Sequence, residues 1–274
     1  MNCSCSTPSA SLGVLAVIQD VSAPVHARRQ QEALNRQLQR ALSSRDEFLS
    51  IASHELRTPL TGMKLHLQTA RRSLAREQGA PLQPARMERL ISQSEHGLSR
   101  MTRLIEDMLD ISRIQGGRLQ LHVESVDLAH LVRDTLDRFE AQLAEVGSTL
   151  AVELPEALHL GGDRLRFEQV LTNLLTNAIR YAPGAPIRVA LAEEAEHAVL
   201  RFEDGGPGIA SEDQARVFER FERLIPASHV SGLGLGLYIV LEIVHAHGGT
   251  VALNSEPGQG TRFTVRLPLG ARAA

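Results

Sequence analysis

The stretch Phe48-Leu49-Ser50-Ile51-Ala52-Ser53-His54-Glu55-Leu56-Arg57-Thr58-Pro59-Leu60 places one histidine inside a helical pattern of apolar residues. Ala52 and Leu56 belong to the apolar side of this pattern, and His54 lies two residues from each of them. Because an α-helix turns about 100° per residue, His54 points roughly 200° away from both positions. We therefore expect its imidazole to face solvent. An inert surface histidine would have the same phase, so the phase alone leaves that alternative open.

The apolar pattern around His54 continues in both directions in alternating steps of three and four residues. Before the break at Gly79–Pro84 it comprises Leu34, Leu38, Ala41, Phe48, Leu49, Ala52, Leu56, Met63, Leu67, Ala70 and Leu74. A second series after the break comprises Met87, Ile91, Ser94, Leu98, Met101, Ile105 and Met108. Two heptad series joined by a short Pro/Gly turn predict a helical hairpin. Since one hairpin buries little apolar surface, we expect two chains to pair in a homodimeric four-helix bundle.

After Gly116-Gly117 the chain changes to short strands and helices in separate runs. Alternating apolar and polar residues predict strands at Arg118–Val123, Thr149–Leu154, Ile187–Ala192, Ala198–Glu203, Thr250–Asn254 and Thr261–Leu267. Helices are expected at Leu128–Phe139 with Asp127 as its cap, after Gly161-Gly162-Asp163, and near Leu235–His247. The apolar side of the second helix comprises Leu165, Phe167, Val170, Leu171, Leu174, Leu175 and Ala178. This arrangement predicts an α+β sandwich.

The composition bears on several classes of protein. The 274 residues suffice for two modest domains, and 29 basic against 32 acidic residues leave no footprint for nucleic acid. Cys3 and Cys5 are the only cysteines, which favours a reducing cytosol over a disulfide framework or a zinc site. The apolar run Leu12–Ile18 is too short to cross a bilayer, so we expect no membrane contact from it.

Three clusters in the second half of the chain have residue types that suit a bound nucleotide. Asn173 and Asn177 share one helix face, where two amide oxygens suit Mg²⁺, although a solvated pair is the simpler alternative. Asp204-Gly205-Gly206-Pro207-Gly208-Ile209 follows a strand and offers a carboxylate for an exocyclic amine, or is an ordinary loop. Gly232-Leu233-Gly234-Leu235-Gly236-Leu237 opens a helix, where free N–H groups form an anion cradle or glycines serve close packing.

In their order, these motifs resemble the catalytic core of the sensor histidine kinases of two-component signalling. The stretch His54–Leu60 matches the H-box of that family, and Asn173–Ala178 matches its N-box. The two glycine boxes correspond to Asp204–Ile209 and Gly232–Gly236, with the F-box at Phe218–Phe221 between them. The resemblance covers about residues 45–268. Gly205 stands where asparagine is common, Leu233 where a small or polar residue is frequent, and Arg180 where lysine is frequent.

The resemblance implies an ATP-binding domain of the type shared with gyrase and Hsp90. By motif, Asp204 would bind the adenine amine, and Asn177, assisted by Asn173, would hold Mg²⁺ on the triphosphate. Arg180 would stabilise charge as the γ-phosphoryl group departs. The other residues that the resemblance assigns to the ATP site are Tyr181, Gly206, Gly208, Phe218, Phe221, Arg223, Gly232, Gly234, Gly236 and Leu237.

The resemblance also implies that His54 is the phosphoacceptor of an autophosphorylating protein-histidine kinase. Glu55 would orient its imidazole, Thr58 would support phosphatase action, and Pro59 would bend the helix. The next acceptor would be an aspartate on the receiver domain of a response regulator. An alternative is an ATP-binding dimeric module that acts mainly as a regulator phosphatase or sequestration partner. The sequence leaves open whether transfer occurs within or between protomers.

The expected domain order has three parts. Residues 1–26 form a leader that includes a strand at Leu12–Asp20, which resembles the end of a PAS-type sensor domain. Residues 27–116 form a linker helix with the dimerisation and histidine phosphotransfer domain, and residues 117–270 form the catalytic ATP-binding domain. The cysteine usage and the resemblance together predict a cytoplasmic location for this part of the protein.

Overall fold

The structure is a computed structural model that describes residues 50–72, 84–116, 119–224 and 233–270, with Gln31, Asn35 and Gln39. The expected strand at Leu12–Asp20, most of the apolar series before residue 50, and the turn over residues 79–83 lie outside the described residues. All elements below belong to the unit Ser50–Ala274.

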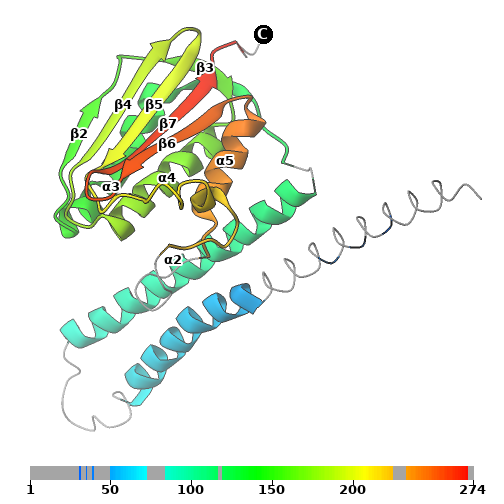
Figure 1. Cartoon of the computed structure of the whole chain (residues 1–274). Coiled ribbons are helices and arrows are strands. Elements are labelled where there is room, and N and C mark those ends of the chain that lie inside the picture. Colours follow the sequence, from blue (N-terminus) through cyan, green and yellow to red (C-terminus); the bar gives the residue numbers. More distant parts are fainter. Residues whose placement is uncertain are drawn as a thin grey trace, which may run out of the picture. The chain divides into compact units, whose positions relative to one another are not determined.

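Two long helices follow the two apolar series. Residues 50–72 are helical, and α2 runs from Pro84 to Gln115 (Figure 1). The Glu55 carboxylate is buried between them and accepts a hydrogen bond from Arg100 of α2 at 3.0 Å. This contact between the two helices, with Ala52 also buried, confirms the predicted helical hairpin.

Many apolar positions of the hairpin remain exposed in the single chain. The exposed fractions are 67% for Leu67, 51% for Ile91, 57% for Leu98 and 45% for Ile105, all members of the two predicted series. Large exposed apolar surfaces usually mark an interaction site. The hairpin thus leaves open the surface that a second hairpin would cover.

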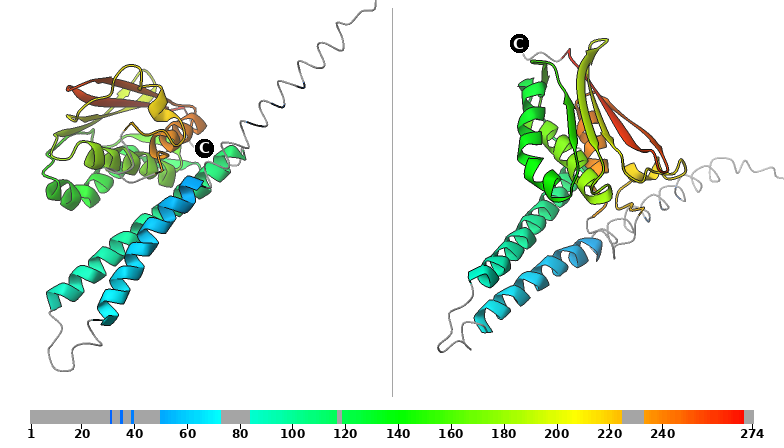
Figure 2. Two further views of the ribbon diagram at one scale, coloured as in Figure 1. Left: turned by 60° about the horizontal axis from the view of Figure 1, so that its bottom comes forward. Right: turned by 90° about the vertical axis from the view of Figure 1, so that its left-hand side faces the viewer.

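A five-stranded mixed sheet forms one layer of the following part. Its order is β2 (Leu150–Glu153), β4 (Ile187–Glu194), β5 (His197–Asp204), β7 (Gly260–Pro268) and β6 (Thr250–Glu256). Only the β2–β4 pair of this sheet is parallel. The helices α3 (Leu128–Glu145), α4 (Arg164–Tyr181) and α5 (Gly236–Ala246) cover one face (Figure 2). A short 3₁₀ helix, η1 (Arg216–Phe218), precedes α5.

A second, two-stranded sheet pairs β1 (Glu124–Asp127) with β3 (His159–Gly162) in antiparallel register. The predicted strand at Arg118–Val123 is wrong, because residues 119–123 have no regular secondary structure and β1 begins after them. The partner strand ends at Gly162, opposite Glu124, and leaves nothing for the earlier residues to pair with. The backbone N–H of His122 instead donates to the Asp163 carboxylate at 3.0 Å.

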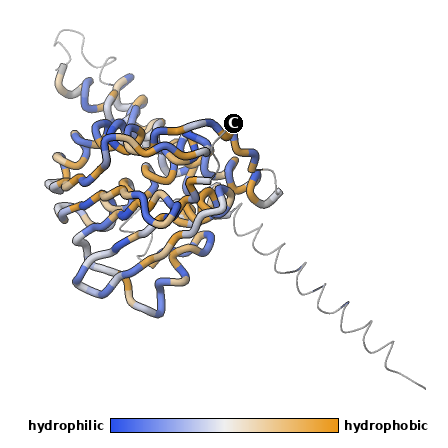
Figure 3. Tube along the Cα trace, turned by 90° about the horizontal axis from the view of Figure 1, so that it is seen from above, coloured by the Kyte–Doolittle hydropathy of each residue, from blue (hydrophilic) through white to orange (hydrophobic). Residues whose placement is uncertain are grey.

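The helix caps and core of this layer follow the sequence closely. Asp127 accepts hydrogen bonds from the N–H groups of Ala129 and His130, and Asp163 caps α4 in the same way through Arg166. Figure 3 shows the alternation of apolar and polar residues along the strands. Leu165 is 75% exposed and does not belong to the apolar side of α4, because it is off the phase of the buried residues. The buried residues of α4 are Phe167, Val170, Leu171, Asn173, Leu174, Leu175 and Ala178.

The helix α2 also packs against this α+β layer. Leu104 and Ile111 of α2 are 5% and 2% exposed and join the same apolar cluster as the buried residues of α3, α4 and α5. Asp110, in the last third of α2, accepts from Arg166 and Gln169 of α4, both at 2.7 Å. Within the described residues, no helix has both the length and the apolarity needed to cross a membrane.

Candidate active site

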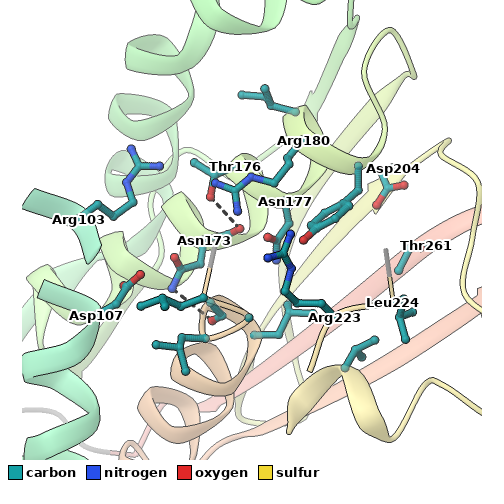
Figure 4. Close-up of a pocket in the computed structure, with 18 of the residues that line it drawn as sticks. Arg103, Asp107, Asn173, Thr176, Asn177, Arg180, Asp204, Arg223, Leu224 and Thr261 are labelled. Atoms are coloured by element: carbon teal, nitrogen blue, oxygen red, sulfur yellow. Dashed lines mark hydrogen bonds between the residues drawn. The ribbon is translucent and has the colours of Figure 1, made fainter. Parts of the chain in front are cut away.

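A cavity of about 680 Å³ opens where α2, α4, the end of β5 and the start of α5 meet (Figure 4). Its volume falls within the usual range for pockets that hold small molecules and cofactors. The residues assigned to an ATP site by motif that line it are Asn173, Asn177, Arg180, Tyr181, Asp204, Gly208, Arg223, Gly234, Gly236 and Leu237. Segments that are far apart in the sequence therefore line one cavity.

Helix α4 carries the amide face of the cavity. Asn173 and Asn177 lie one turn apart, and both side chains point into the hollow (Figure 4). Asn173 is buried, and its Nδ2 donates to the carbonyl oxygen of Gly236 at 3.3 Å. A Cβ at Gly236 would lie 3.6 Å from the Asn173 amide oxygen, so the first residue of α5 sits against that amide. Amide oxygens beside a polyphosphate are ligands that Mg²⁺ accepts, so this face fits that cation.

The start of α5 forms a glycine-rich wall of the cavity. Leu235 precedes the helix, and its side chain does not cap the N–H groups of the first turn. Gly234, just before it, has a φ of +68°, and a Cβ there would lie 2.6 Å from the carbonyl oxygen of Glu222. The Gly234 carbonyl also accepts from the N–H of Phe221 at 3.1 Å. This close approach holds the Arg223 segment beside the helix start.

Asp204 ends β5 at another wall of the cavity. Burial raises the pKa of its carboxyl, although Oδ1 accepts a hydrogen bond from the Gly206 N–H at 3.0 Å. Gly208 has a φ of +71°, and a Cβ there would lie 2.0 Å from the carbonyl oxygen of Glu256. The glycines therefore allow a tight turn that keeps the Asp204 carboxylate at the cavity wall.

Three of the assigned residues lie outside the cavity lining. A Cβ at Gly206 would lie 2.6 Å from the Cβ of Ala182, which indicates a packing role. Phe218 packs edge-on against Phe263, with ring centroids 6.4 Å apart, and Phe221 also packs against the apolar core. Phe218 and Phe221 therefore support the loop that carries Arg223. Gly232 lies outside the described residues.

Helix α2 adds a charged face that the motifs did not predict. Arg100, Arg103 and Asp107 line the cavity, with Arg103 and Asp107 beside Asn173 in Figure 4. Burial raises the pKa of Asp107 to about 7. Burial lowers the pKa of Arg180, and the neighbouring charges of Arg103 and Arg100 lower it further. Arg100, Arg103 and Asp107 are spaced by three and four residues, which places them on one face of the helix. The sequence does not indicate which other segment that face contacts.

His54 stands apart from this cavity lining. Its side chain is 75% exposed, which confirms the expected solvent-facing imidazole. The Glu55 carboxylate is 3.9 Å from His54 Nδ1, beyond hydrogen-bond length, because its other oxygen is engaged by Arg100 at 3.0 Å. Thr58 donates its hydroxyl to the His54 carbonyl at 3.2 Å and so lies on the same helix face. The Glu55 carboxylate is thus not hydrogen-bonded to His54 in this structure, and its orienting role stays a prediction.

Comparison with known proteins places both parts of the chain in one family. Residues 44–117 match the model of the His Kinase A (phospho-acceptor) domain, and residues 162–271 match that of the histidine kinase-, DNA gyrase B- and HSP90-like ATPase. The alginate biosynthesis sensor protein KinB of Pseudomonas aeruginosa is 36% identical over 94% of this chain and 40% of its own length. The adaptive-response sensory kinase SasA of Synechocystis sp. is 30% identical over 97% of this chain and 69% of its own.

A solved structure, full-length ShkA in complex with AMPPNP, is 26% identical, with a TM-score of 0.59 over 84% of this chain and 47% of that chain. The chain spans about half the length of the first curated relatives that it matches. Both family models, the relatives and the shared fold agree on one assignment. The chain belongs to the sensor histidine kinase family of two-component signalling.

Proposed function

We propose that this chain is an ATP-dependent protein-histidine kinase that autophosphorylates on His54 and passes the phosphoryl group to an aspartate of a response regulator. One observation carries the proposal: the two asparagines, the aspartate and the glycine-rich helix start line a single cavity, in a chain whose motif histidine is exposed. Family membership, and the AMPPNP bound in the related ShkA structure, support ATP as the nucleotide.

Within the cavity we assign the binding roles by chemistry. Asp204 would accept a hydrogen bond from the adenine amine, and the first turn of α5 would bind phosphate oxygens. Asn177, with Asn173 beside it, would hold Mg²⁺, which supplies charge neutralisation on the triphosphate when bound. Arg180 and Arg223 bring fixed positive charge to the same hollow.

The transfer step uses the exposed imidazole of His54. With its Nδ1–H held by a carboxylate, the lone pair on Nε2 attacks the γ-phosphorus, and the bond to the β,γ-bridging oxygen breaks to release ADP. The Nδ1 proton then passes to that carboxylate or to water, which leaves a phosphoramidate with a neutral imidazole ring and an anionic phosphoryl group. Such an N–P bond has a high transfer potential, which suits onward transfer to an aspartate. We propose that Thr58, on the same face, supports hydrolysis of the regulator's phosphoaspartate.

The domain and assembly assignments are also proposals. We assign residues 1–26 to a sensor-domain end, 27–116 to the dimerisation and phosphotransfer domain, and 117–270 to the ATP-binding domain. The matched ranges of the two family models support the last two. The exposed apolar positions of the hairpin support a homodimer. Because ATP is its substrate, we place this reaction in the cytoplasm.

The test is labelling with γ-³²P-ATP and Mg²⁺, followed by acid and base treatment of the product. We expect acid-labile, base-stable label in the wild type and none in His54→Gln. The matched control is His130→Gln, because His130 is also an exposed helical histidine, with Asp134 3.4 Å away, but lies outside the motif. Label that survives in His54→Gln would contradict the assignment, and nucleotide binding without any label would favour the phosphatase or sequestration alternative.

Mixing two defective variants shows the direction of transfer. His54→Gln retains the ATP site, and Asn177→Ala retains the phosphoacceptor. Label restored in the mixed dimers means transfer between protomers, and no restoration means transfer within one.

A further inference from the structure

Arg100 lies between the nucleotide cavity and the carboxylate next to the phosphoacceptor histidine. Its side chain lines the nucleotide cavity, and its Nη2 donates to Glu55 Oε2 at 3.0 Å. Glu55 is the neighbour of His54, and its side chain is only 9% exposed. One guanidinium therefore connects the cavity with the carboxylate beside the phosphoacceptor.

Three guanidinium groups lie near one another at the end of the cavity where α2 meets α4: those of Arg100, Arg103 and Arg180. Arg100 and Arg103 both lower the pKa of Arg180, which means that the three guanidinium groups lie close enough to repel one another. A carboxyl within the same hollow, Asp107, has its pKa raised to about 7 and so is partly neutral at that pH. A bound triphosphate, which carries several negative charges, would offset the repulsion among these three guanidinium groups.

The Glu55 carboxylate is out of position for the role that the transfer step requires. The separation of its Oε1 from His54 Nδ1 is 3.9 Å, about one ångström longer than a charge-assisted hydrogen bond. The ion pair between Arg100 and the other carboxylate oxygen accounts for this displacement. Loss of the Arg100 contact would leave the Glu55 carboxylate free to approach the imidazole.

We propose that Arg100 is a positioning residue that exchanges Glu55 for the terminal phosphate of the bound nucleotide. This inference rests on the proposed function. When a nucleoside triphosphate fills the cavity, Arg100 turns to the γ-phosphate, and Glu55 then accepts the Nδ1–H of His54. The exchange selects the tautomer in which Nε2 carries the lone pair, so the nucleophile is prepared only when a transferable phosphoryl group is present.

A nucleoside diphosphate is expected to act differently. It lacks the γ-phosphate that competes for Arg100, so Glu55 stays paired with Arg100 and His54 keeps its unbound tautomer balance. After transfer, the loss of the third phosphate returns Arg100 to Glu55. The phosphorylated histidine is then no longer in contact with the carboxylate that assisted its formation.

The test combines ¹⁵N NMR of histidine side chains with AMPPNP and ADP titrations in the presence of Mg²⁺. His54→Gln identifies the His54 signals. In the wild type we expect AMPPNP to shift His54 toward the Nδ1–H tautomer and ADP to leave it unchanged. In Arg100→Ala we expect that tautomer without nucleotide, no further shift with AMPPNP, and about tenfold weaker AMPPNP binding with little change for ADP.

Two further variants separate exchange from a structural role. Glu55→Gln removes the competitor for Arg100, so we expect AMPPNP to bind several-fold more tightly, which a merely structural Glu55 would not produce. Arg103→Ala is the matched control, because Arg103 also lines the cavity from α2, whereas the arginine that pairs with Glu55 is Arg100. It should weaken AMPPNP binding yet keep the wild-type His54 signal without nucleotide and its shift at saturation.

Each outcome decides the proposal. AMPPNP that binds without shifting His54, or an Arg100→Ala chain whose nucleotide-free His54 signal equals that of the wild type, overturns the exchange and leaves the proposed function intact. A wild-type chain that binds no AMPPNP overturns the proposed function and the exchange together. Tighter AMPPNP binding by Glu55→Gln supports the exchange even where Arg100→Ala folds poorly.

Discussion

At the residue scale, Asp107 has an acid–base property that can be measured without substrate. Its pKa is about 7, raised mainly by burial and further by Asp110 and Glu106, while Arg103 opposes the rise. The folded chain thus holds a proton that the unfolded chain releases near pH 4. This contribution to stability is complete below about pH 4 and is lost as the pH rises through 7.

We expect Asp107→Asn to raise the free energy of unfolding at pH 8 by roughly 2 kcal/mol and to change it little at pH 4. Urea denaturation at a series of pH values measures this difference. Glu106→Gln is the control, because it removes a carboxylate from the adjacent, exposed position of the same helix. Equal effects of the two substitutions at pH 8 would show that Asp107 carries no special burial cost.

The sequence predicts the site residue by residue only where a motif is local. Asn173 and Asn177 could be placed on one face because helical spacing determines it, and the structure brings both to the cavity. Arg100 and Arg103 could not be assigned, because their role arises from contact between segments about seventy residues apart. The contact of Glu55 with Arg100 could not be predicted for a related reason: the two residues are 45 positions apart, on the two helices of the hairpin.

At the scale of elements, Asp110 is the main polar contact between α2 and α4. Its side chain is 8% exposed and bonds Arg166, itself 15% exposed, at 2.7 Å. Removal of one partner leaves the other charge buried with the neutral Gln169 amide still bonded to it, and loss of a buried ion-pair partner typically costs about 3 to 5 kcal/mol. We expect Asp110→Ala and Arg166→Ala each to destabilise the chain by about 3 kcal/mol, with a coupling energy of about 1 to 3 kcal/mol in a double-mutant cycle.

The matched control for this cycle is the pair Asp134–Arg164. It joins α3 to α4 with the same two residue types, but at 3.5 Å and with side chains 33% and 41% exposed. Its coupling energy should stay below about 1 kcal/mol, because solvent screens exposed pairs. Similar coupling energies in both cycles, measured by chemical denaturation, would argue against Asp110 as a buried connection.

The sequence predicts elements well where a cap or an alternating pattern marks them. Asp127 and Asp163 indicated two helix starts correctly, and both strands of the last hairpin, β6 and β7, lie where alternation predicts. The strand expected at Arg118–Val123 shows the limit of such patterns. Alternation tests whether a segment suits a sheet, but the end of β3 at Gly162 decides whether a partner is present.

At the scale of the whole molecule, the exposed side of the hairpin predicts its assembly. Leu98 is 57% exposed within the second heptad series, and a charge there would oppose pairing with another hairpin. Burial of one leucine contributes about 1.5 to 3 kcal/mol, and a dimer contains two copies. We expect Leu98→Glu to weaken the dimer by at least a hundredfold in sedimentation equilibrium.

Leu165→Glu provides the control for this substitution. Leu165 is even more exposed, at 75%, but it lies on α4 outside the hairpin. It should leave the association constant unchanged. A wild-type chain that sediments as a monomer at micromolar concentration would refute the predicted four-helix bundle, whatever the variants do.

The apolar contact of Leu104 and Ile111 with the α+β layer has a consequence for temperature. Any motion that lifts this layer from α2 exposes two side chains that are now 5% and 2% accessible, at a cost of roughly 3 kcal/mol, or about a hundredfold in population. Attraction between apolar surfaces weakens on cooling, whereas hydrogen bonds and ion pairs do not follow that trend. The lifted arrangement should therefore become relatively more populated in the cold, so the contact between α2 and the α+β layer would loosen on cooling.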